Sequence, residues 1–383
     1  MSATTRGGLE DVIATTSAIC AVDGAQGKLY YRGYDIDDLA THATFEEVTY
    51  LLWHGELPGR SALTAFRQTL AAHRALTPTT LALLRLLPNQ AHPLTVLRTA
   101  VSALGLSDPD ANVHTPEAHL QQSLQLTAQL PTISAAWQRL RHGQPPIAPR
   151  DDLGQAANYL YMLTGTIPDP VAAHTMDLAF ILQADHELNA STFAARVAAA
   201  TETDLYGAVT AALATLKGPK HGGANEDSIH MFAEIGTPER AALWVQKRLA
   251  WRATLTSEQR QAPQARFPGF GHRVYKVDDP RAAHLRRSAR ELTAGTDVAS
   301  WFTISETVRT IVQRELGLPV NLDFYSALVY YALGIPTDLY TSVFACARIA
   351  GWTAHIMEQY AHNRLIRPRA SYIGPAPRPY PAT

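Results

Sequence analysis

Three short segments of the sequence each carry one side chain that can accept or donate a proton, beside residues that interrupt regular backbone. They are Gly218-Pro-Lys-His-Gly-Gly223 with His221, Gly269-Phe-Gly-His-Arg273 with His272, and Pro319-Val-Asn-Leu-Asp323 with Asp323. Two imidazoles and one carboxylate can together remove a proton from a weakly acidic carbon and stabilise the oxyanion that results. A single histidine or aspartate at a helix end is often only a cap, so the set matters more than any one member.

Cationic side chains follow His272 at short intervals. Arg273, Lys276 and Arg281 come after it in the chain, a pattern that indicates a pocket for an anion. The preceding Gly269-Phe-Gly271 starts like a dinucleotide-binding fingerprint, but it lacks the third glycine and the strand-to-helix turn. We therefore predict an anion site here and exclude a dinucleotide site.

Two other groups contain residue types that bind metals. Asp185-His-Glu187 lacks the second histidine that a His-Glu-x-x-His zinc motif requires. His355, Glu358 and His362 fall at positions i, i+3 and i+7, so they could share one helix face and suit a weak site. Such a face is more often solvated or packed, and we predict no metal.

Composition limits the class of protein. The chain of 383 residues, 46% of them hydrophobic, can bury more than one core, and its net charge of −1 favours neither nucleic acid nor an anionic membrane. Cys20 and Cys346 are the only cysteines, too few for a disulfide framework, which indicates a reducing compartment. The start, Met1–Asp11, lacks the apolar run of a signal peptide, and no stretch of about 18 apolar residues could span a membrane. We expect a soluble, cytoplasmic protein.

Secondary-structure signals predict a mostly helical chain with one small β element. Strand-forming residues at Ala14–Val22 and Leu29–Tyr34 flank turn residues around Gly24, which predicts a hairpin. From Phe45 onward apolar residues recur with the period of a helix. The helical segments expected in this part are Ser61–Leu76, Thr79–Leu87, Thr95–Leu104, Ala118–Arg141, Gln155–Leu163, Val171–Leu188 and Thr192–Lys217.

Two joints rich in glycine or proline, residues 218–223 and 319–323, divide the chain. The elements expected after the first joint are helices at Pro238–Leu255, Pro280–Ala294 and Val298–Leu316, an exposed polar loop at Ser257–Pro268, a long helix at Asp338–Asn363 and a proline-rich arm at Pro375–Thr383. We predict a large domain of residues 1–220 and 326–383, and a small inserted domain of residues 221–325. The catalytic candidates lie near the joints, where a closing cleft would place them.

Together these motifs resemble the citrate synthase family, in the family's order and over nearly the whole chain. The segments that carry the resemblance are Gly8–Ala14, Tyr31–Ile36, Tyr50–Pro58, His92–Ala103, Asp185–Thr192, the three segments described first, and Arg364–Arg369. The resemblance implies a multi-helical fold with a large domain and a smaller closing domain, which agrees with the division above.

The resemblance also implies a role for each candidate residue. Asp323 would be the base that removes a methyl proton from acetyl-CoA, His221 the donor to the thioester oxygen, and His272 the donor to the oxaloacetate carbonyl. The oxaloacetate ligands implied by the family pattern are His186, Arg281, Arg348 and Arg367, and those implied for the CoA phosphates are Lys276 and Arg273. Arg367 would come from a second subunit, which implies a homodimer with shared sites. No metal is implied, and no cofactor beyond the CoA thioester substrate.

Three features depart from the family pattern. Lys220 stands before His221 where an apolar residue is expected, and a cation there would oppose protonation of His221 unless it points to solvent. Cys346 replaces another small residue near Arg348, with little consequence expected. The stretch Trp251–Phe267 is longer than the family's link, which predicts a surface insertion in the small domain.

The implied reaction joins acetyl-CoA, oxaloacetate and water into citrate and CoA. A 2-methylcitrate synthase would use propionyl-CoA with the same residues. One methylene in an acyl pocket changes selectivity by only ~1–3 kcal/mol, so the sequence leaves the acyl chain open. A catalytically silent paralogue that acts as an interaction subunit is a third interpretation, which the intact set of histidines, aspartate and arginines disfavours.

Overall fold

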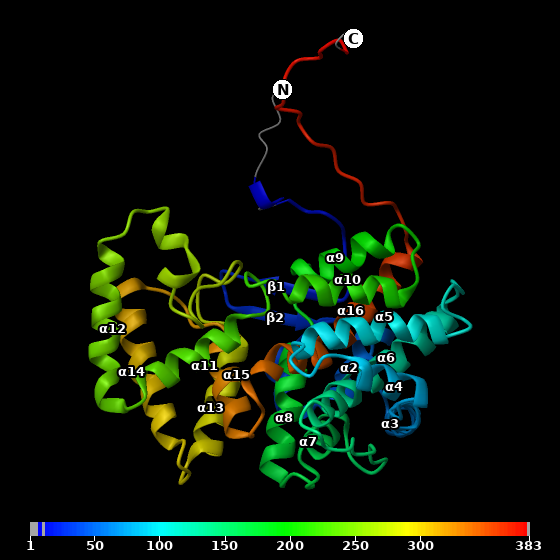
Figure 1. The fold of residues 1–383 in the computed structure, drawn as a ribbon, viewed down its shortest axis with the longest axis horizontal. Helices are drawn as coiled ribbons and strands as arrows, with labels where there is room; N and C mark the ends of the chain where they lie inside the picture. The colour runs from blue at the N-terminus through cyan, green and yellow to red at the C-terminus, as the bar shows by residue number, and fades with distance from the viewer. Residues whose placement is uncertain (1–6, 10–11, 381–383) are drawn as a thin grey trace.

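The computed structural model describes residues 7–9 and 12–380, and most of these lie in helices, with one small sheet near the N terminus (Figure 1). The predicted fold class, mostly α with an N-terminal β element, is confirmed. Most of Met1–Asp11, where the sequence predicts no signal peptide, and the end of the Pro375–Thr383 arm fall outside the described residues. Within the described part, no helix is both long and apolar enough to cross a membrane.

The sheet is the predicted hairpin extended by a third strand. β1 (Cys20–Asp23), β2 (Lys28–Tyr31) and β3 (Tyr34–Asp35) pair antiparallel in that order, so the first strand begins later than Ala14. The turn between β1 and β2 packs against the segment after His272, because a Cβ on Gly24 would clash with the Val274 carbonyl. Lys276 donates its backbone N–H to the Gly24 carbonyl at 2.8 Å. The hairpin therefore supports the loop that carries His272.

The helices between the sheet and the first joint are α1 (Ile36–His42), α2 (Phe45–His54), α3 (Arg60–Ala72), α4 (Pro78–Leu86), α5 (Pro93–Ser107), α6 (Pro116–Leu140), α7 (Gln155–Thr164), α8 (Pro170–Gln183), α9 (Ala190–Ala199) and α10 (Leu205–Leu216). Proline in the first turn begins α4, α5, α6 and α8, where its missing N–H costs nothing. Thr44 and Glu47 form a capping box at the start of α2.

Two of the expected helices are wrong in this part of the chain. Val171–Leu188 is helical only to Gln183, and residues 184–189 form a loop. Thr192–Lys217 is two helices, because Glu202 takes a left-handed φ of 61° and Asp204 caps a new helix. Helix α1 is not among the helices that the sequence predicts, which begin at Phe45.

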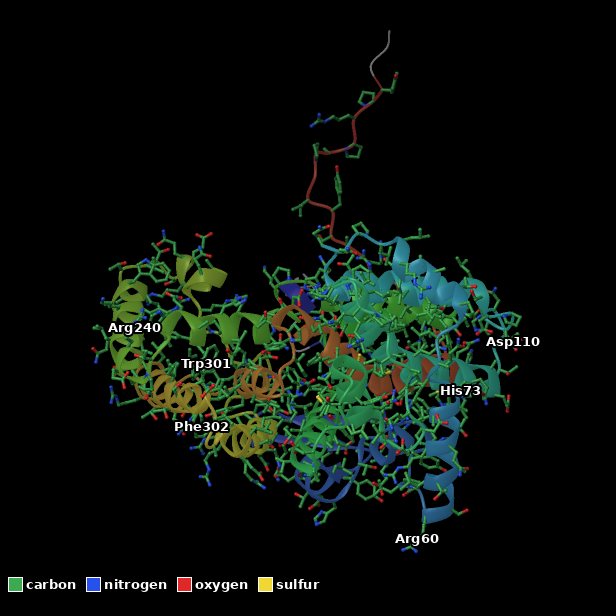
Figure 2. The ribbon with its side chains drawn as sticks, turned by 60° about the horizontal axis from the view of Figure 1, so that its bottom comes forward. Arg60, His73, Asp110, Arg240, Trp301 and Phe302 are labelled. Carbon is green, nitrogen blue, oxygen red and sulfur yellow. The ribbon has the colours of Figure 1, made fainter. Side chains whose placement is uncertain are left out.

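The helices after the first joint are α11 (Ala224–Ile235), α12 (Pro238–Ala253), α13 (Pro280–Thr293), α14 (Ala299–Leu316), α15 (Leu322–Ala332) and α16 (Tyr340–Ala361). Helices α11 to α15 gather at one end of the molecule, on the left of Figure 1. Figure 2 shows Arg240, Trp301 and Phe302 at that end, apart from Arg60, His73 and Asp110 in the rest. The predicted boundary between residues 325 and 326 falls inside α15, and the division into two domains stays a prediction.

Helix α16 is buried along most of its length. It packs against α6, α8, α9 and α10, and Trp352 on it has no exposed surface. The same helix buries Arg348, which is 2% exposed, and His355, which is 0% exposed. A buried polar or charged side chain is costly without polar partners. Arg348 and His355 must therefore contact other polar groups in the interior.

The segment Ser257–Pro268 is only partly the exposed loop that the sequence predicts. It forms two 3-10 turns, Gln259–Gln261 and Pro263–Ala265, and both Ala265 and Phe267 are buried. Arg252 of α12 donates from Nη1 to the Ala265 carbonyl oxygen at 2.6 Å. The expectation of an exposed loop is therefore wrong at the C-terminal end of this segment, which is tied to α12.

Candidate active site

The loops that carry His272 and Asp323 are joined through their backbones. Asn321 donates its backbone N–H to the Gly269 carbonyl at 2.9 Å. Gly269 has a φ of +78° and no room for a side chain, because a Cβ there would lie 2.6 Å from the Phe324 side chain. This close approach fixes the His272 loop against the first turn of α15, where Asp323 lies.

His272 is a neutral imidazole with its proton on Nε2. Its Nδ1 accepts the backbone N–H groups of Val274 at 3.0 Å and Tyr275 at 3.1 Å. Burial, together with the charge of Arg281, lowers the pKa of His272 to about 4. Since the nitrogen that accepts carries no proton, Nε2–H is the donor that His272 can offer to a ligand.

His221 is also neutral, with its proton on the opposite nitrogen. Its Nε2 accepts the backbone N–H of Ser191 at 3.3 Å and lies 2.9 Å from the Ser191 hydroxyl oxygen. The indole N–H of Trp352 donates to that hydroxyl at 3.1 Å and holds it in place. Burial, together with the charge of Arg348, lowers the pKa of His221 to about 4. The ring proton therefore lies on Nδ1.

Asp323 supplies the carboxyl group of the site. It lies in the first turn of α15, and its backbone N–H donates to Asn321 Oδ1 at 3.0 Å. Burial raises the pKa of the Asp323 carboxyl group to about 6, although the charges of Arg281 and Arg348 act in the opposite direction. A carboxylate whose pKa lies near neutrality is a stronger base than an exposed one and is still mostly ionised at pH 7.

Arg348 has two guanidinium nitrogens, Nη1 and Nη2, available to a ligand near His221 and Asp323. It donates from Nε to the Gln183 carbonyl at 2.6 Å, and its guanidinium lies 4.5 Å from the centre of the Phe344 ring. No hydrogen bond joins its two Nη atoms to the described residues. Its charge acts on both His221 and Asp323. The Nη atoms are thus placed to bind a carboxylate by two parallel hydrogen bonds.

Arg281 is held more tightly than Arg348. Its Nε and Nη2 donate to the two carboxylate oxygens of Asp279 at 2.9 and 2.7 Å, and both side chains are buried. Burial would lower the pKa of Arg281, but Asp279 outweighs it and raises the pKa. Nη1 makes only a long contact of 3.4 Å with the Leu182 carbonyl. Arg281 therefore has one nitrogen to offer to a ligand.

His186 lies beside the His272 ring. It is 8% exposed, and its ring centre lies 5.3 Å from that of His272. Nε2 lies 3.2 Å from the Tyr275 hydroxyl. Burial, together with Arg281, lowers the pKa of His186 well below its usual value, so it too is neutral.

The structure thus brings six of the predicted site residues into one electrostatically coupled group, namely His186, His221, His272, Arg281, Asp323 and Arg348. A base and two neutral N–H donors can deprotonate a carbon next to a carbonyl and hold the resulting oxyanion, while the arginines hold carboxylates. Among the described residues, no three histidine, cysteine, aspartate or glutamate side chains are grouped to hold a metal ion.

Comparison with known proteins decides the family. The model of the citrate synthase C-terminal domain matches residues 8–369. The chain belongs to the citrate synthase family. The predicted membership is confirmed, and members of this family are acyltransferases.

Individual relatives align over almost the whole chain. It is 46% identical to citrate synthase 2 of Bacillus subtilis, over 96% of this chain and 95% of that protein. It is 40% identical to 2-methylcitrate synthase of Mycobacterium tuberculosis strain H37Rv, over 98% of this chain and 92% of that protein. The solved citrate synthase of Thermoplasma acidophilum, in complex with carboxymethyl-CoA and oxaloacetate, superposes with a TM-score of 0.90 at 32% identity, covering 97% of each chain.

The remaining site residues implied by the family pattern are exposed, although the charge of Lys276 also helps to lower the pKa of His272. Arg367 is exposed on the segment after α16, which runs away from the body in both views (Figures 1 and 2). Arg273 and Lys276 are exposed on the loop after His272. Lys220 is exposed as well, so packing does not force its charge toward His221.

Three residues of this site escaped the sequence reasoning. Ser191, which fixes the tautomer of His221, lies within the family-like segment Asp185–Thr192, but nothing in its residue type or spacing marks it as part of the site. Asn321 stands two residues before Asp323, the spacing of a helix cap, and Asp279 precedes Pro280, which is typical of a helix start. Both signals were present in the sequence, but they indicate capping and do not reveal the contact with the site.

Proposed function

We propose that this protein is a citrate synthase, which condenses acetyl-CoA with oxaloacetate and water to give citrate and CoA. The observation that carries the proposal is the pair of neutral histidines in the site. His221 accepts a backbone N–H at Nε2, and His272 accepts two at Nδ1, so each ring keeps one N–H for a ligand. Two such donors beside one carboxylate of raised pKa suit the formation and capture of an enolate.

The proposed reaction begins with proton removal. Asp323 takes a proton from the methyl carbon of the thioester, while Nδ1–H of His221 donates to the thioester oxygen on which negative charge develops. Nε2–H of His272 donates to the ketone oxygen of oxaloacetate and makes its carbon more electrophilic. The new carbon–carbon bond turns that ketone into a hydroxyl group, and water then cleaves the thioester to release citrate and CoA.

Substrate binding would use the arginines. Arg348, Arg281 and His186 would hold the oxaloacetate carboxylates, and Arg273 and Lys276 the CoA phosphates. We further propose a homodimer in which Arg367 of a second copy completes the site. The exposure of Arg367 supports its availability to a second copy, and the Thermoplasma relative, solved with carboxymethyl-CoA and oxaloacetate, supports the choice of ligands. The proposal needs no metal and no cofactor besides CoA, and a cytoplasmic location stays a prediction.

A 2-methylcitrate synthase is the second candidate, because a relative at 40% identity bears that name. Release of the CoA thiol, followed with oxaloacetate and either acetyl-CoA or propionyl-CoA, separates the candidates. A kcat/KM at least tenfold higher with acetyl-CoA supports the proposal, and the reverse preference replaces it with the second candidate. Absence of thiol release with both donors would leave only the silent paralogue.

A further inference from the structure

A line of buried polar side chains connects α9, α16 and the loop that carries His186. Arg196 of α9 donates from Nη1 to His355 Nδ1 at 3.0 Å and to Glu358 at 2.6 Å. His355 Nε2 lies 3.2 Å from Asp185 Oδ2, and both of these side chains are completely buried. His355 and Glu358 both accept hydrogen bonds from Arg196. Their spacing therefore does not correspond to a weak metal site.

Arg196, as the donor, determines which ring nitrogen of His355 carries the proton. A guanidinium can only donate, so His355 Nδ1 must accept and its proton must lie on Nε2. Nε2–H then donates to Asp185. Burial would raise the pKa of Asp185, but His355 and the charge of Arg348 outweigh it and lower the pKa. Asp185 is therefore an ionised carboxylate in the interior.

Asp185 lies against the turn of α16 that begins with Arg348. Along this turn Arg348 Nε donates to the Gln183 carbonyl and the Gly351 N–H donates to the Ala184 carbonyl, at 2.6 and 3.0 Å. A Cβ on Gly351 would collide with Asp185 Oδ1, so only glycine allows the carboxylate to come this close to the helix. Oδ1 itself has no hydrogen bond to the described residues.

Two cations near this carboxylate, Arg348 and Arg32, have no hydrogen-bonded anion among the described residues, and Arg32 is influenced by Glu358 before Asp185. Arg281 is paired with Asp279, and Arg196 with Glu358. Other titratable or charged side chains that interact with Asp185 or Arg348 are Cys20, Tyr31, Arg32, His186, Glu187, His221 and Asp323. Asp185 is the strongest favourable influence on the Arg348 charge.

We propose that Asp185, held by His355 and Arg196, is the resident counter-ion of Arg348, whose charge it compensates while the dicarboxylate pocket is empty. The inference rests on the proposed function in one respect, namely that oxaloacetate is the ligand of Arg348. Asp185 stabilises the empty protein, and its negative charge at the same time opposes a dianionic ligand. Loss of that charge should therefore lower the stability of the ligand-free protein and lower the Kd for the ligand.

The variant Asp185→Asn tests this directly, because an amide keeps the shape and can still accept from His355, while the charge is removed. In the ligand-free protein we expect Tm to fall by about 5 °C, since a buried cation loses its compensation. The Kd for oxaloacetate, measured by isothermal titration, should fall by about tenfold. An unchanged or higher Kd in the folded variant overturns the proposal, because it would mean that Asp185 acts through its shape alone.

A second pair of variants keeps the proposal testable if Asp185→Asn does not fold. His355→Leu removes the donor to Asp185, so burial should raise the pKa of Asp185 into the measurable range. In His355→Leu, the Kd for oxaloacetate should therefore decrease as the pH is lowered from 8.5 to 5.5. This decrease should be larger than in the unmodified protein. His355→Gln can still donate to Asp185 and accept from Arg196, so it should keep the original pH profile. Matching profiles for all three proteins would contradict the proposal.

Stability distinguishes failure of this inference from failure of the proposed function. If oxaloacetate does not bind the unmodified protein, the proposed function is wrong. The counter-ion is then tested by unfolding Asp185→Asn, Arg348→Gln and the double variant without ligand. The two charges should be coupled, so that the double variant loses less free energy of unfolding than the sum of the losses in the two single variants. Additive effects would rule the counter-ion out.

Discussion

The side-chain amide of Asn321 donates from Nδ2 to the carbonyl oxygen of Gly271 at 3.0 Å. Gly271 is the residue before His272, and the other end of the same amide caps the helix that begins beside Asp323, through Oδ1 at 3.0 Å. One planar group thus joins the base and the proposed electrophilic histidine. The geometry of the two catalytic candidates depends on a residue that need not touch a substrate.

Asn321→Ser separates the two functions of that amide. Serine caps a helix about as well as asparagine but is too short to reach Gly271. We expect kcat to fall about 10- to 100-fold, because the base and the donor lose their relative position, while Tm and the Kd for oxaloacetate change little. Steady-state kinetics, thermal unfolding and isothermal titration measure the three quantities. If kcat survives in Asn321→Ser, the amide is only a cap.

Asp323→Ala should reduce kcat by about 100-fold or more, because it removes the base and the neighbouring buried carboxylate, Asp279, is paired with Arg281. Oxaloacetate should still bind, since the arginines remain. Thiol release and isothermal titration on the same preparation measure both effects. Substantial turnover by the folded variant would remove Asp323 from the role of base.

The pH dependence of kcat should report the ionisation of Asp323. With a pKa of about 6, the carboxyl group is protonated below pH 6 and cannot act as a base, so kcat should fall about tenfold per pH unit below that value. His221 and His272, with pKa values of about 4, stay neutral from pH 5 to 8 and should not contribute. A rate that rises as the pH falls from 7 to 5 would be inconsistent with this assignment.

Glu306 should control the acid stability of the helices around Asp323. It accepts hydrogen bonds from Arg286, Arg309 and the hydroxyl of Tyr325, which joins α13, α14 and α15. Burial would raise the pKa of Glu306, but the hydrogen bonds, that of Arg286 foremost, lower it to about 2. A lowered pKa stabilises the fold above the unfolded value near 4.5, and the stabilisation is lost as the pH falls toward 2.

Glu306→Gln should therefore reduce the free energy of unfolding by about 2 kcal/mol at pH 7 and by much less at pH 3. Urea unfolding at the two pH values measures the difference. The exposed pair Arg314 and Glu315 on the same helix supplies a control, because Glu315→Gln should change stability little at either pH. Equal losses for Glu306→Gln at both values would contradict the lowered pKa.

The sequence predicts the types and order of the catalytic candidates but not how they are held. The tautomer of His221 depends on Ser191, which is distant in the chain, and no local pattern encodes that contact. The sequence indicates an apolar helix start at Asp323 but not the extent of α15, because Tyr325, Leu328 and Tyr330 are buried together with nearly every other residue of the helix, so no amphipathic period remains. Arg281 could be recognised as a cation of the site, whereas its pairing with Asp279 could not.

The exposed position of Arg367 leads to the last prediction. In the single chain this side chain is exposed on the segment after α16 that leaves the body, yet the family pattern implies that it binds oxaloacetate (Figure 1). If it serves the site of a second copy, Arg367→Ala should weaken oxaloacetate binding about tenfold or more. The folded core should be unaffected, because the side chain is exposed.

Mixing Arg367→Ala with His272→Ala distinguishes a shared site from an unshared one. A mixed dimer would contain one site with both defects and one with neither, so random exchange of subunits should restore about a quarter of the original sites. Activity of the mixture is measured by thiol release, and exchange is followed by mass spectrometry with one subunit isotopically labelled. If Arg367 acted on its own chain, both sites of every mixed dimer would be defective. A mixture that stays inactive after exchange is complete would therefore place Arg367 outside any shared site.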